Sequence, residues 1–152
     1  MSISNQLKIR PFKVDDQDPV RELILSGLEE RWGILDLSQN SDLADIADTY
    51  RDGVFLVGMI DEEIVGTGAF LPEKESVCRI VRMSTRKDLR NQGIGTQVLE
   101  QLVSIAKSQG YELIALETTA TWQDAVNFYL KRGFQSQGIK GGDHHFVRSI
   151  RV

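Results

Sequence analysis

Residues 90–96 read Arg-Asn-Gln-Gly-Ile-Gly-Thr, and this stretch decides how the surrounding sequence is interpreted. Residues 76–85 before it carry several β-branched side chains, which predicts a strand. Residues 94–109 place apolar side chains at helical spacing and are followed by Gly110, a typical residue just past a helix. The stretch is therefore predicted to be a loop that joins a strand to a helix.

The residue types in this loop suit a phosphate group. Backbone N–H groups at the start of a helix are unpaired and carry a partial positive charge. Gly93 and Gly95 let a ligand approach the main chain, while Thr96 and Arg90 add a hydroxyl and a guanidinium donor. Two common nucleotide loops do not fit: a dinucleotide fingerprint needs a third glycine where Val98 stands, and a triphosphate loop needs a Lys after Gly95.

Length and composition narrow the class of protein around this loop. The 152 residues predict a single domain over residues 1–152, and the net charge of −4 argues against a nucleic-acid binder. Two histidines and the single Cys78 are too few for a zinc site, so no metal is expected. No apolar run is long enough to span a membrane, and the N-terminus lacks a signal-peptide pattern. We expect a cytoplasmic protein without membrane or nucleic-acid partners.

The charges are unevenly distributed along the chain. Residues 15–52 hold eleven acidic residues against three arginines, whereas residues 79–90 hold five basic residues against Asp88. A compact basic segment in an acidic protein suggests a local anion site. The alternative is a solvated basic turn.

The remaining elements are predicted from apolar periodicity and turn residues. Helices are expected at residues 19–33, 42–50 and 123–132, and strands at residues 7–10, 54–60, 64–71, 113–116, 134–138 and 144–152. This order predicts a mixed α/β domain with a central sheet that is covered on both faces.

A second motif follows the loop at residues 128–134, which read Phe-Tyr-Leu-Lys-Arg-Gly-Phe, with Ala125 three residues before them. Residues 90–95 resemble the Arg/Gln-x-x-Gly-x-Gly/Ala signature of the GNAT superfamily of N-acetyltransferases, and residues 128–134 resemble its Phe-Tyr-x-x-x-Gly-Phe segment. The two motifs and their flanking elements cover residues 79–134. The resemblance implies a GNAT-like fold: a mostly antiparallel mixed sheet of six to seven strands with about four helices on both faces.

The resemblance also implies a binding site for acetyl-CoA as co-substrate. The loop N–H groups would hold the pyrophosphate, the edge of the preceding strand would bind the pantetheine arm, and the Met83 amide would face the thioester carbonyl. The residues assigned in this way are Met83, Ser84, Thr85, Arg90, Asn91, Gln92, Gly93, Ile94, Gly95, Thr96 and Phe128.

Tyr129 occupies the position of the family's frequent general acid, which protonates the departing thiolate. The alternative is a core tyrosine that packs on the preceding helix. The sequence departs from the family at two positions. Trp122 replaces an asparagine that often contacts CoA, with Gln123 or Asn127 as substitutes, and Arg79 stands where some relatives carry a glutamate base.

Glu117 is the preferred candidate for the general base, because it is expected at the end of a short strand that borders the ligand crevice. The alternative is that Glu117 caps the turn at residues 118–123. Glu73 and Glu75 are weaker candidates on a predicted loop.

The acceptor is expected to be the primary amine of a small molecule or an amino acid. In the family the first two helices line the acceptor pocket, so we assign Trp32 and Asp36 to it and add His145 as a further lining residue. The acidic segment would attract a cationic amine, or it is simply helix surface. A non-catalytic acyl-CoA sensor on the same fold is the alternative function, and a homodimer is common among relatives.

Overall fold

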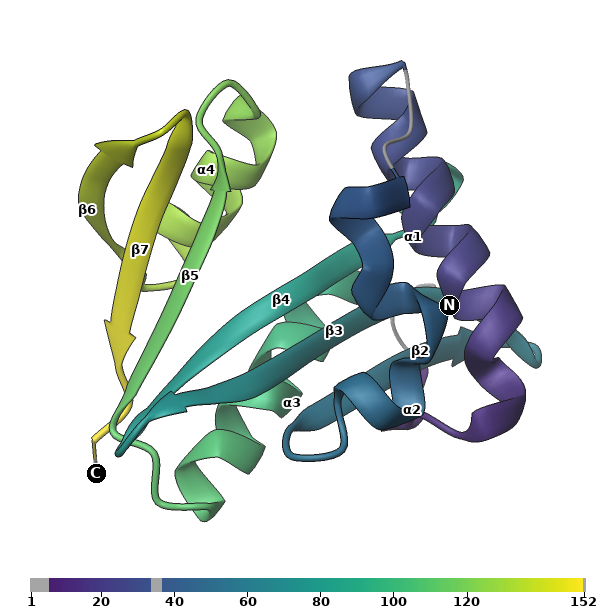
Figure 1. The fold of residues 1–152 in the computed structure, drawn as a ribbon, viewed down its shortest axis with the longest axis horizontal. Coiled ribbons are helices and arrows are strands. Elements are labelled where there is room, and N and C mark those ends of the chain that lie inside the picture. Colours follow the sequence, from purple (N-terminus) through teal and green to yellow (C-terminus); the bar gives the residue numbers. More distant parts are fainter. Residues whose placement is uncertain (1–5, 34–36, 152) are drawn as a thin grey trace. The chain divides into compact units, whose positions relative to one another are not determined.

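The computed structural model describes residues 6–33 and 37–151 as a mixed α/β fold (Figure 1). The strands are β1 (Lys8–Pro11), β2 (Val54–Ile60), β3 (Glu63–Lys74), β4 (Val77–Thr85), β5 (Leu113–Thr119), β6 (Gln135–Lys140) and β7 (Asp143–Ser149). The helices are α1 (Gln17–Trp32), α2 (Ile46–Thr49), α3 (Ile94–Ser108) and α4 (Gln123–Lys131), with short 3-10 helices η2 (Val14–Asp16), η3 (Leu37–Ala44) and η4 (Lys87–Leu89).

The seven strands form one sheet in the order β1-β2-β3-β4-β5-β7-β6. β4 and β5 pair in parallel, whereas β1 with β2, β2 with β3, β5 with β7 and β6 with β7 pair antiparallel. The predicted mixed α/β class and mostly antiparallel sheet are therefore confirmed. β1, the strand predicted at residues 7–10, lies at an edge of the sheet.

The chain forms two compact units. Unit 1 contains the described residues up to Leu71 together with residues 81–102, and unit 2 contains residues 72–80 and 103–151. β3, β4 and α3 contribute residues to both units. The prediction of a single domain over residues 1–152 stays a prediction.

Unit 1 has helices against both faces of its strands. On one face, α1 and the segment from η3 to residue 50 form a core with β2 and β3, made of Val20, Ile24, Leu25, Leu43, Ile46, Tyr50, Phe55, Val57 and Ala69. Burial of these side chains removes about 1.5–3 kcal/mol of unfavourable hydration for each large one.

On the opposite face, α3 approaches β3 so closely that only glycine fits. A Cβ atom at Gly66 would lie 2.8 Å from Ile94, and one at Gly68 would lie 2.8 Å from Val98. Larger residues at these two positions would push α3 away, and with α3 the loop that precedes it. The glycines of β3 therefore set the position of the loop at residues 90–93.

Unit 2 contains β5, β6 and β7, with β7 between the other two (Figure 1). One side of these strands buries Ile114, Leu116 and Phe146. Cys78, on the part of β4 that pairs with β5, is fully buried, and burial raises the pKa of its thiol to about 11. This thiol is a core group and stays protonated at neutral pH.

Several predicted boundaries were wrong, and three of them are instructive. The helix expected at residues 42–50 is divided at Asp45, whose side chain accepts a hydrogen bond from the Asp48 N–H and begins α2 instead of continuing η3. Ala47 is consequently exposed, and Tyr50 takes its place in the core. β3 and β5 are longer than predicted, because polar residues at their ends still pair with neighbouring strands; Thr118 and Thr119, for example, pair with β7.

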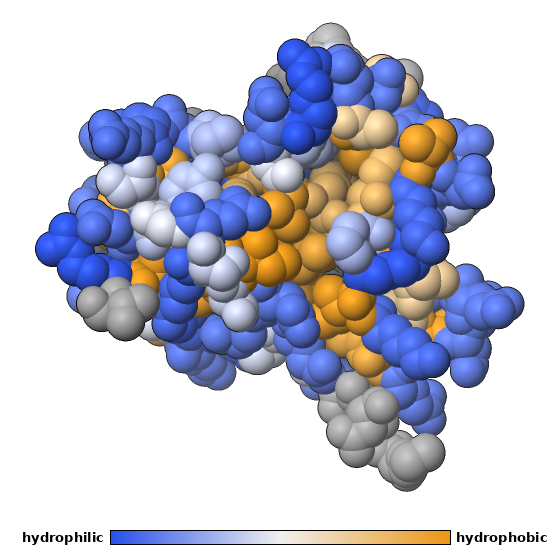
Figure 2. Space-filling view, turned by 90° about the horizontal axis from the view of Figure 1, so that it is seen from below, coloured by the Kyte–Doolittle hydropathy of each residue, from blue (hydrophilic) through white to orange (hydrophobic). Residues whose placement is uncertain are grey.

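Charged and polar side chains make up much of the face shown in Figure 2, with smaller areas of hydrophobic side chains among them. Within the described ranges, none of the helices is both long and apolar enough to span a bilayer.

Candidate functional site

The loop between β4 and α3 exposes its backbone. Asn91 and Gly93 have φ angles of 65° and 90°, in the left-handed region, and residues 91–93 are exposed. Ile94, the first residue of α3, is buried and anchors the start of the helix. The first N–H groups of a helix have no intrahelical partner. The structure thus combines an accessible glycine-containing turn with the N-terminus of a 15-residue helix, as the sequence predicts.

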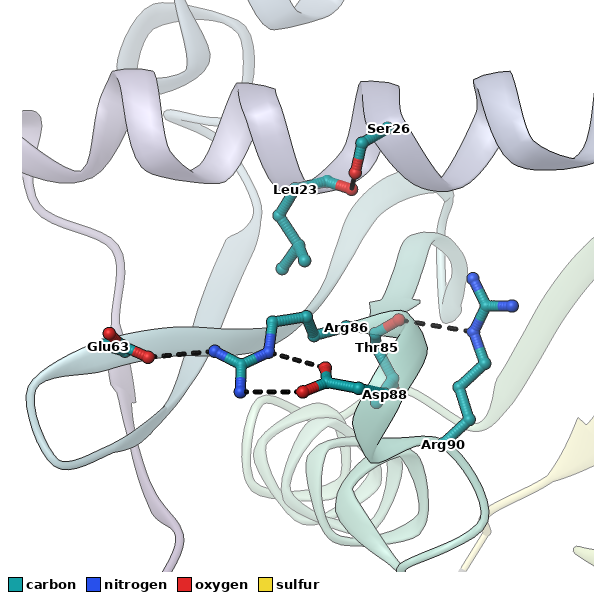
Figure 3. Close-up of polar contacts among 7 residues, drawn as sticks. All are labelled: Leu23, Ser26, Glu63, Thr85, Arg86, Asp88 and Arg90. Carbon is teal, nitrogen blue, oxygen red and sulfur yellow. Dashed lines mark hydrogen bonds and ion pairs between the residues drawn. The ribbon is translucent and has the colours of Figure 1, made fainter. Parts of the chain in front are cut away.

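Arg90 forms an ion pair with a carboxylate of α1. Its guanidinium nitrogens lie 3.0 and 3.1 Å from the two carboxylate oxygens of Glu30 on α1, and its Nε donates to the Thr85 carbonyl at 3.4 Å, as Figure 3 shows for the Thr85 bond. Lys87 lies 4.0 Å from the same carboxylate. Because a carboxylate and a phosphate make the same kind of contact with arginine, this geometry fits a phosphate-binding role.

Arg86, by contrast, is occupied within its own surroundings. It donates to Asp88 at 2.7 and 3.2 Å and to Glu63 at 2.9 Å (Figure 3). These exposed ion pairs form at the turn between β4 and α3 and at the start of β3. Part of the basic segment is therefore a solvated, internally paired turn, which was the alternative that the sequence left open.

The acidic and basic segments are partners within unit 1. Glu30 pairs with Arg90, and Asp42 pairs with Arg82. The sequence suggested separate anion and amine sites, because a count along the chain cannot show which distant charges meet. In unit 1 these two carboxylates contact arginines; the acidic wall expected from the acidic residues of positions 15–52 stays a prediction.

Arg82, Asp42 and Tyr50 form a three-residue cluster, which we call the Arg82 clamp. Arg82 donates to the two Asp42 oxygens at 2.9 and 2.5 Å, and the Tyr50 hydroxyl donates to Asp42 at 2.6 Å. Burial alone would raise the pKa of Asp42, but the hydrogen bonds from Arg82 and Tyr50 outweigh it and hold this pKa below its usual value. Burial and the Asp42 carboxylate raise the pKa of Tyr50.

The sequence did not indicate the Arg82 clamp or the Glu30 contact. Arg82 was counted only as one charge of a basic segment, and its partner lies 40 residues earlier in the chain. A buried tyrosine usually hydrogen-bonds its hydroxyl, but only the structure shows that Tyr50 is buried.

Tyr129, the predicted general acid, lies in an aromatic cluster of unit 2. Its side chain is 8% exposed, and its ring contacts Phe128, Phe134 and Phe146 at centroid distances of 5.1, 5.6 and 6.1 Å. Burial raises the pKa of its phenol above the usual value of 10. The phenol is therefore a protonated group at neutral pH, in the surroundings of a core tyrosine.

The sequence suggested that Glu117 lies at the end of a strand. In the structure it lies within β5, two residues before the strand ends. It pairs across strands with His145 of β7, with its carboxylate 3.5 Å from the imidazole Nε2, and 3.9 Å from Arg79 of β4. The Glu117 carboxylate thus contacts His145 and Arg79, whereas the alternative in the sequence was that it caps the turn at residues 118–123. Glu73 lies on β3, not on a loop, and binds Arg79 at 2.8 Å.

The start of α4 differs from the family pattern in a definite way. Trp122 is the residue before the helix, and Gln123 donates to the Asn127 side-chain oxygen at 2.9 Å. The two amides expected to substitute for the missing asparagine are thus bonded to each other. Phe128 is half-buried beneath Arg132, whose guanidinium carbon lies 3.9 Å from the ring centroid.

The residues predicted to line the acceptor pocket belong to different elements of the fold. Trp32 ends α1 and is 56% exposed, and His145 is on β7 beside Glu117. Asp36 lies outside the described residues. The assignment of these three residues to one pocket stays a prediction.

The fold and the loop together define a class: a mixed α/β protein with an anion-accepting, glycine-containing loop between a strand and a helix. The chain belongs to the acetyltransferase (GNAT) family, whose profile matches residues 18–134. The family predicted from residues 90–95 and 128–134 is thereby confirmed.

The chain is similar to curated N-acetyltransferases from the rat. It is 33% identical over 105 residues to N-acetyltransferase 8F1 of Rattus norvegicus. The aligned region covers 64% of this chain and 48% of that protein. It is 32% identical over 114 residues to N-acetyltransferase family 8 member 2 of the same species, covering 70% of this chain and 48% of the relative. The chain thus spans about half the length of the curated relatives that it matches.

Solved structures show the same fold. A GNAT-family acetyltransferase from Staphylococcus aureus Mu50 matches with a TM-score of 0.88 and 23% identity over 95% of this chain and 99% of the other. The PaiA N-acetyltransferase from Thermoplasma acidophilum, solved in complex with coenzyme A, matches with a TM-score of 0.81 and 17% identity over 94% and 98%.

Proposed function

We propose that this protein is an acetyl-CoA-dependent N-acetyltransferase that transfers the acetyl group directly to a primary amine of a small molecule or an amino acid. The observation that carries the proposal is the exposed loop before α3, where Asn91 and Gly93 have left-handed backbone and the adjacent Arg90 forms an ion pair with the Glu30 carboxylate. Family membership and the similarity to curated N-acetyltransferases support it.

Residues of unit 1 would bind the co-substrate. The N–H groups of residues 91–96 and the Arg90 guanidinium would hold the pyrophosphate, with Arg90 exchanging Glu30 for phosphate. Met83, Ser84 and Thr85 are partly exposed at the end of β4, so the edge of this strand offers backbone groups to the amides of the pantetheine arm. Phe128 of unit 2 is assigned to the same ligand by family resemblance.

The proposed chemistry is a direct acyl transfer from the thioester of acetyl-CoA to the amine. The amine nitrogen forms a bond to the thioester carbonyl carbon, the Met83 N–H stabilises the negative oxygen, and the carbon–sulfur bond then breaks. Tyr129 donates its proton to the leaving thiolate, and Glu117 accepts a proton from the amine. Burial raises the pKa of Tyr129, which makes the phenol a weaker acid than an ordinary tyrosine and favours the alternative of a core residue.

Thiol release from acetyl-CoA with a panel of primary amines tests the proposal. Loss of the phenol in Tyr129→Phe is expected to lower kcat about 100-fold, which is the scale of general acid catalysis, and to leave CoA affinity unchanged. Tyr111→Phe, which removes a phenol just before β5, is the matched control. A Tyr129→Phe variant with wild-type kcat would show that Tyr129 is a core residue only.

A non-catalytic acyl-CoA sensor is the second candidate. The aromatic surroundings of Tyr129 and the Gln123–Asn127 bond favour it, because both are arrangements of a structural helix. CoA binding without thiol release on any amine of the panel would support the sensor. Absence of CoA binding would exclude both candidates.

A cytoplasmic location is part of the proposal. The unpaired, buried Cys78 favours a reducing compartment, since disulfides are common in small secreted domains. Fractionation of cells that express a tagged full-length protein would test this part separately.

A further inference from the structure

β4 changes the alternation of its side chains at Arg82. Val81 packs against the core of α1, η3 and α2, and Arg82 bonds to Asp42 of η3, so two successive side chains face the same side. Met83 then points to the opposite face, where its sulfur would lie 2.6 Å from a Cβ atom at Gly68, beside Val98 of α3. Ser84 returns toward Gly27 of α1, at 3.6 Å from a Cβ atom there. Arg82 is therefore the extra residue of a β-bulge.

The backbone at this bulge is held in an unfavourable conformation. Arg82 has a φ of 57°, in the left-handed region that glycine adopts freely and that a long side chain such as arginine disfavours. Two contacts oppose a return to regular strand geometry. The buried Thr67 hydroxyl donates to the Arg82 carbonyl at 2.8 Å, and the Arg82 side chain is bonded to Asp42 through both Nε and an Nη nitrogen.

The position of the bulge connects it to the next residue, Met83. A bulge interrupts the regular ladder of hydrogen bonds, which leaves nearby backbone groups available to a ligand. A one-residue shift also exchanges the faces of every following side chain. Without the bulge, Met83 would face α1 and Ser84 would face α3, and the Met83 amide would point in a different direction.

We propose that Arg82 is a positioning residue and that the Arg82 clamp aims the Met83 amide at the acyl carbonyl of the co-substrate. This inference rests on the proposed function, in which Met83 faces that carbonyl. It adds Asp42 and Tyr50 to the residues on which the binding of the acyl group depends. Asp42 and Tyr50 do not touch the ligand. They act by keeping the bulge in place, and the clamp thereby discriminates the acylated from the free form of CoA.

The test compares the affinities of acetyl-CoA and of free CoA, measured by calorimetry on the full chain, so it needs no amine acceptor. Asp42→Asn is expected to weaken acetyl-CoA binding about threefold to tenfold, the scale of one hydrogen bond, and to change CoA binding less than twofold. Tyr50→Phe is the milder variant and is expected to act in the same direction. Asp48→Asn, which breaks the exposed Asp48–Arg51 pair in the same segment, is the control and should change neither affinity.

A pair of double variants isolates the backbone effect. In an Asp42→Asn background, Arg82→Gly adopts a left-handed φ freely, whereas Arg82→Ala does not. The glycine variant should therefore retain more of the preference for acetyl-CoA than the alanine variant.

The outcomes separate the inference from the proposed function. Equal losses for both ligands, or no loss in Asp42→Asn and Tyr50→Phe, would overturn the positioning role, whereas thiol release from acetyl-CoA by the wild-type chain decides the proposed function separately. If Asp42→Asn does not fold, Tyr50→Phe decides. If the wild-type chain binds neither ligand, both the inference and the proposed function are overturned.

Discussion

Two arginines close to each other in sequence are held by carboxylates of the same acidic segment in different ways. Arg82 and Asp42 expose only 17% and 24% of their side chains, and Tyr50 adds a third hydrogen bond. Arg90 and Glu30 expose 28% and 30%, and the second acceptor of Arg90 is the Thr85 carbonyl. The first pair is a closed cluster, whereas the second leaves its arginine at the edge of an exposed loop.

The difference separates a permanent contact from an exchangeable one. A mostly buried carboxylate inside a closed cluster is left with an unmet desolvation penalty when it loses its arginine, so its pair is hard to break. A somewhat more exposed pair beside an exposed loop contributes less, because water and salt replace the partner. We therefore interpret Arg82–Asp42 as part of the framework and Arg90–Glu30 as a contact that a phosphate displaces.

The largest difference is expected in stability. Arg82→Met leaves Asp42 without its main partner and should lower the free energy of unfolding by about 2 kcal/mol, whereas Arg90→Met should lower it by less than about 0.5 kcal/mol. Urea denaturation of both variants at pH 7 measures this. Equal losses would contradict the distinction between the two pairs.

The pH dependence of stability should show which carboxylate is responsible. The pKa of Asp42 is lowered in the folded protein, so its contribution is fully present above the unfolded pKa of about 3.9 and is lost as pH falls through the folded pKa. The stability difference between wild type and Asp42→Asn should be constant between about pH 5 and 7 and shrink below about pH 4. A difference that stays constant to pH 2.5 would exclude the Asp42 charge as its source.

For CoA affinity we expect the opposite order: Arg90 should matter more than Arg82. Arg90→Gln is expected to weaken CoA binding about tenfold, the equivalent of about 1.4 kcal/mol for one charge-assisted contact with phosphate. Arg82→Met should change CoA affinity less than about twofold. Isothermal titration with CoA at low salt measures both, and a larger effect from Arg82 would reverse our assignment.

The smallest effect is expected at Glu30. If this carboxylate occupies the place of a phosphate on Arg90, Glu30→Gln should raise CoA affinity about threefold. Glu29→Gln removes a charge from the adjacent residue of α1 and serves as the control for the general change in potential. Equal gains in both variants would mean that only net charge matters.

Much of the fold was predictable because its signals are local. The apolar spacing of α3 and its end at Gly110, the strand at β2 and the turn after it depend on residues that are neighbours in sequence. Predictions failed where a polar side chain replaced a backbone partner, as at Asp45, or where polar residues continue a strand, as in β5. Sequence patterns do not record which strand supplies the partner of a polar residue.

In the candidate site, too, the local features were predictable and the long-range contacts were not. The sequence by itself determined the loop at residues 90–96, the motif that contains Tyr129 and the family, because the chemistry of a glycine turn before a helix lies within a few consecutive residues. Only the tertiary structure decided that Arg82 begins a bulge, that Asp42 and Tyr50 hold it, and that Glu30 occupies Arg90. The two arginine–carboxylate contacts join residues that are 40 and 60 positions apart along the chain. Charge alone cannot assign such partners, since any arginine attracts any carboxylate and only packing selects the pair.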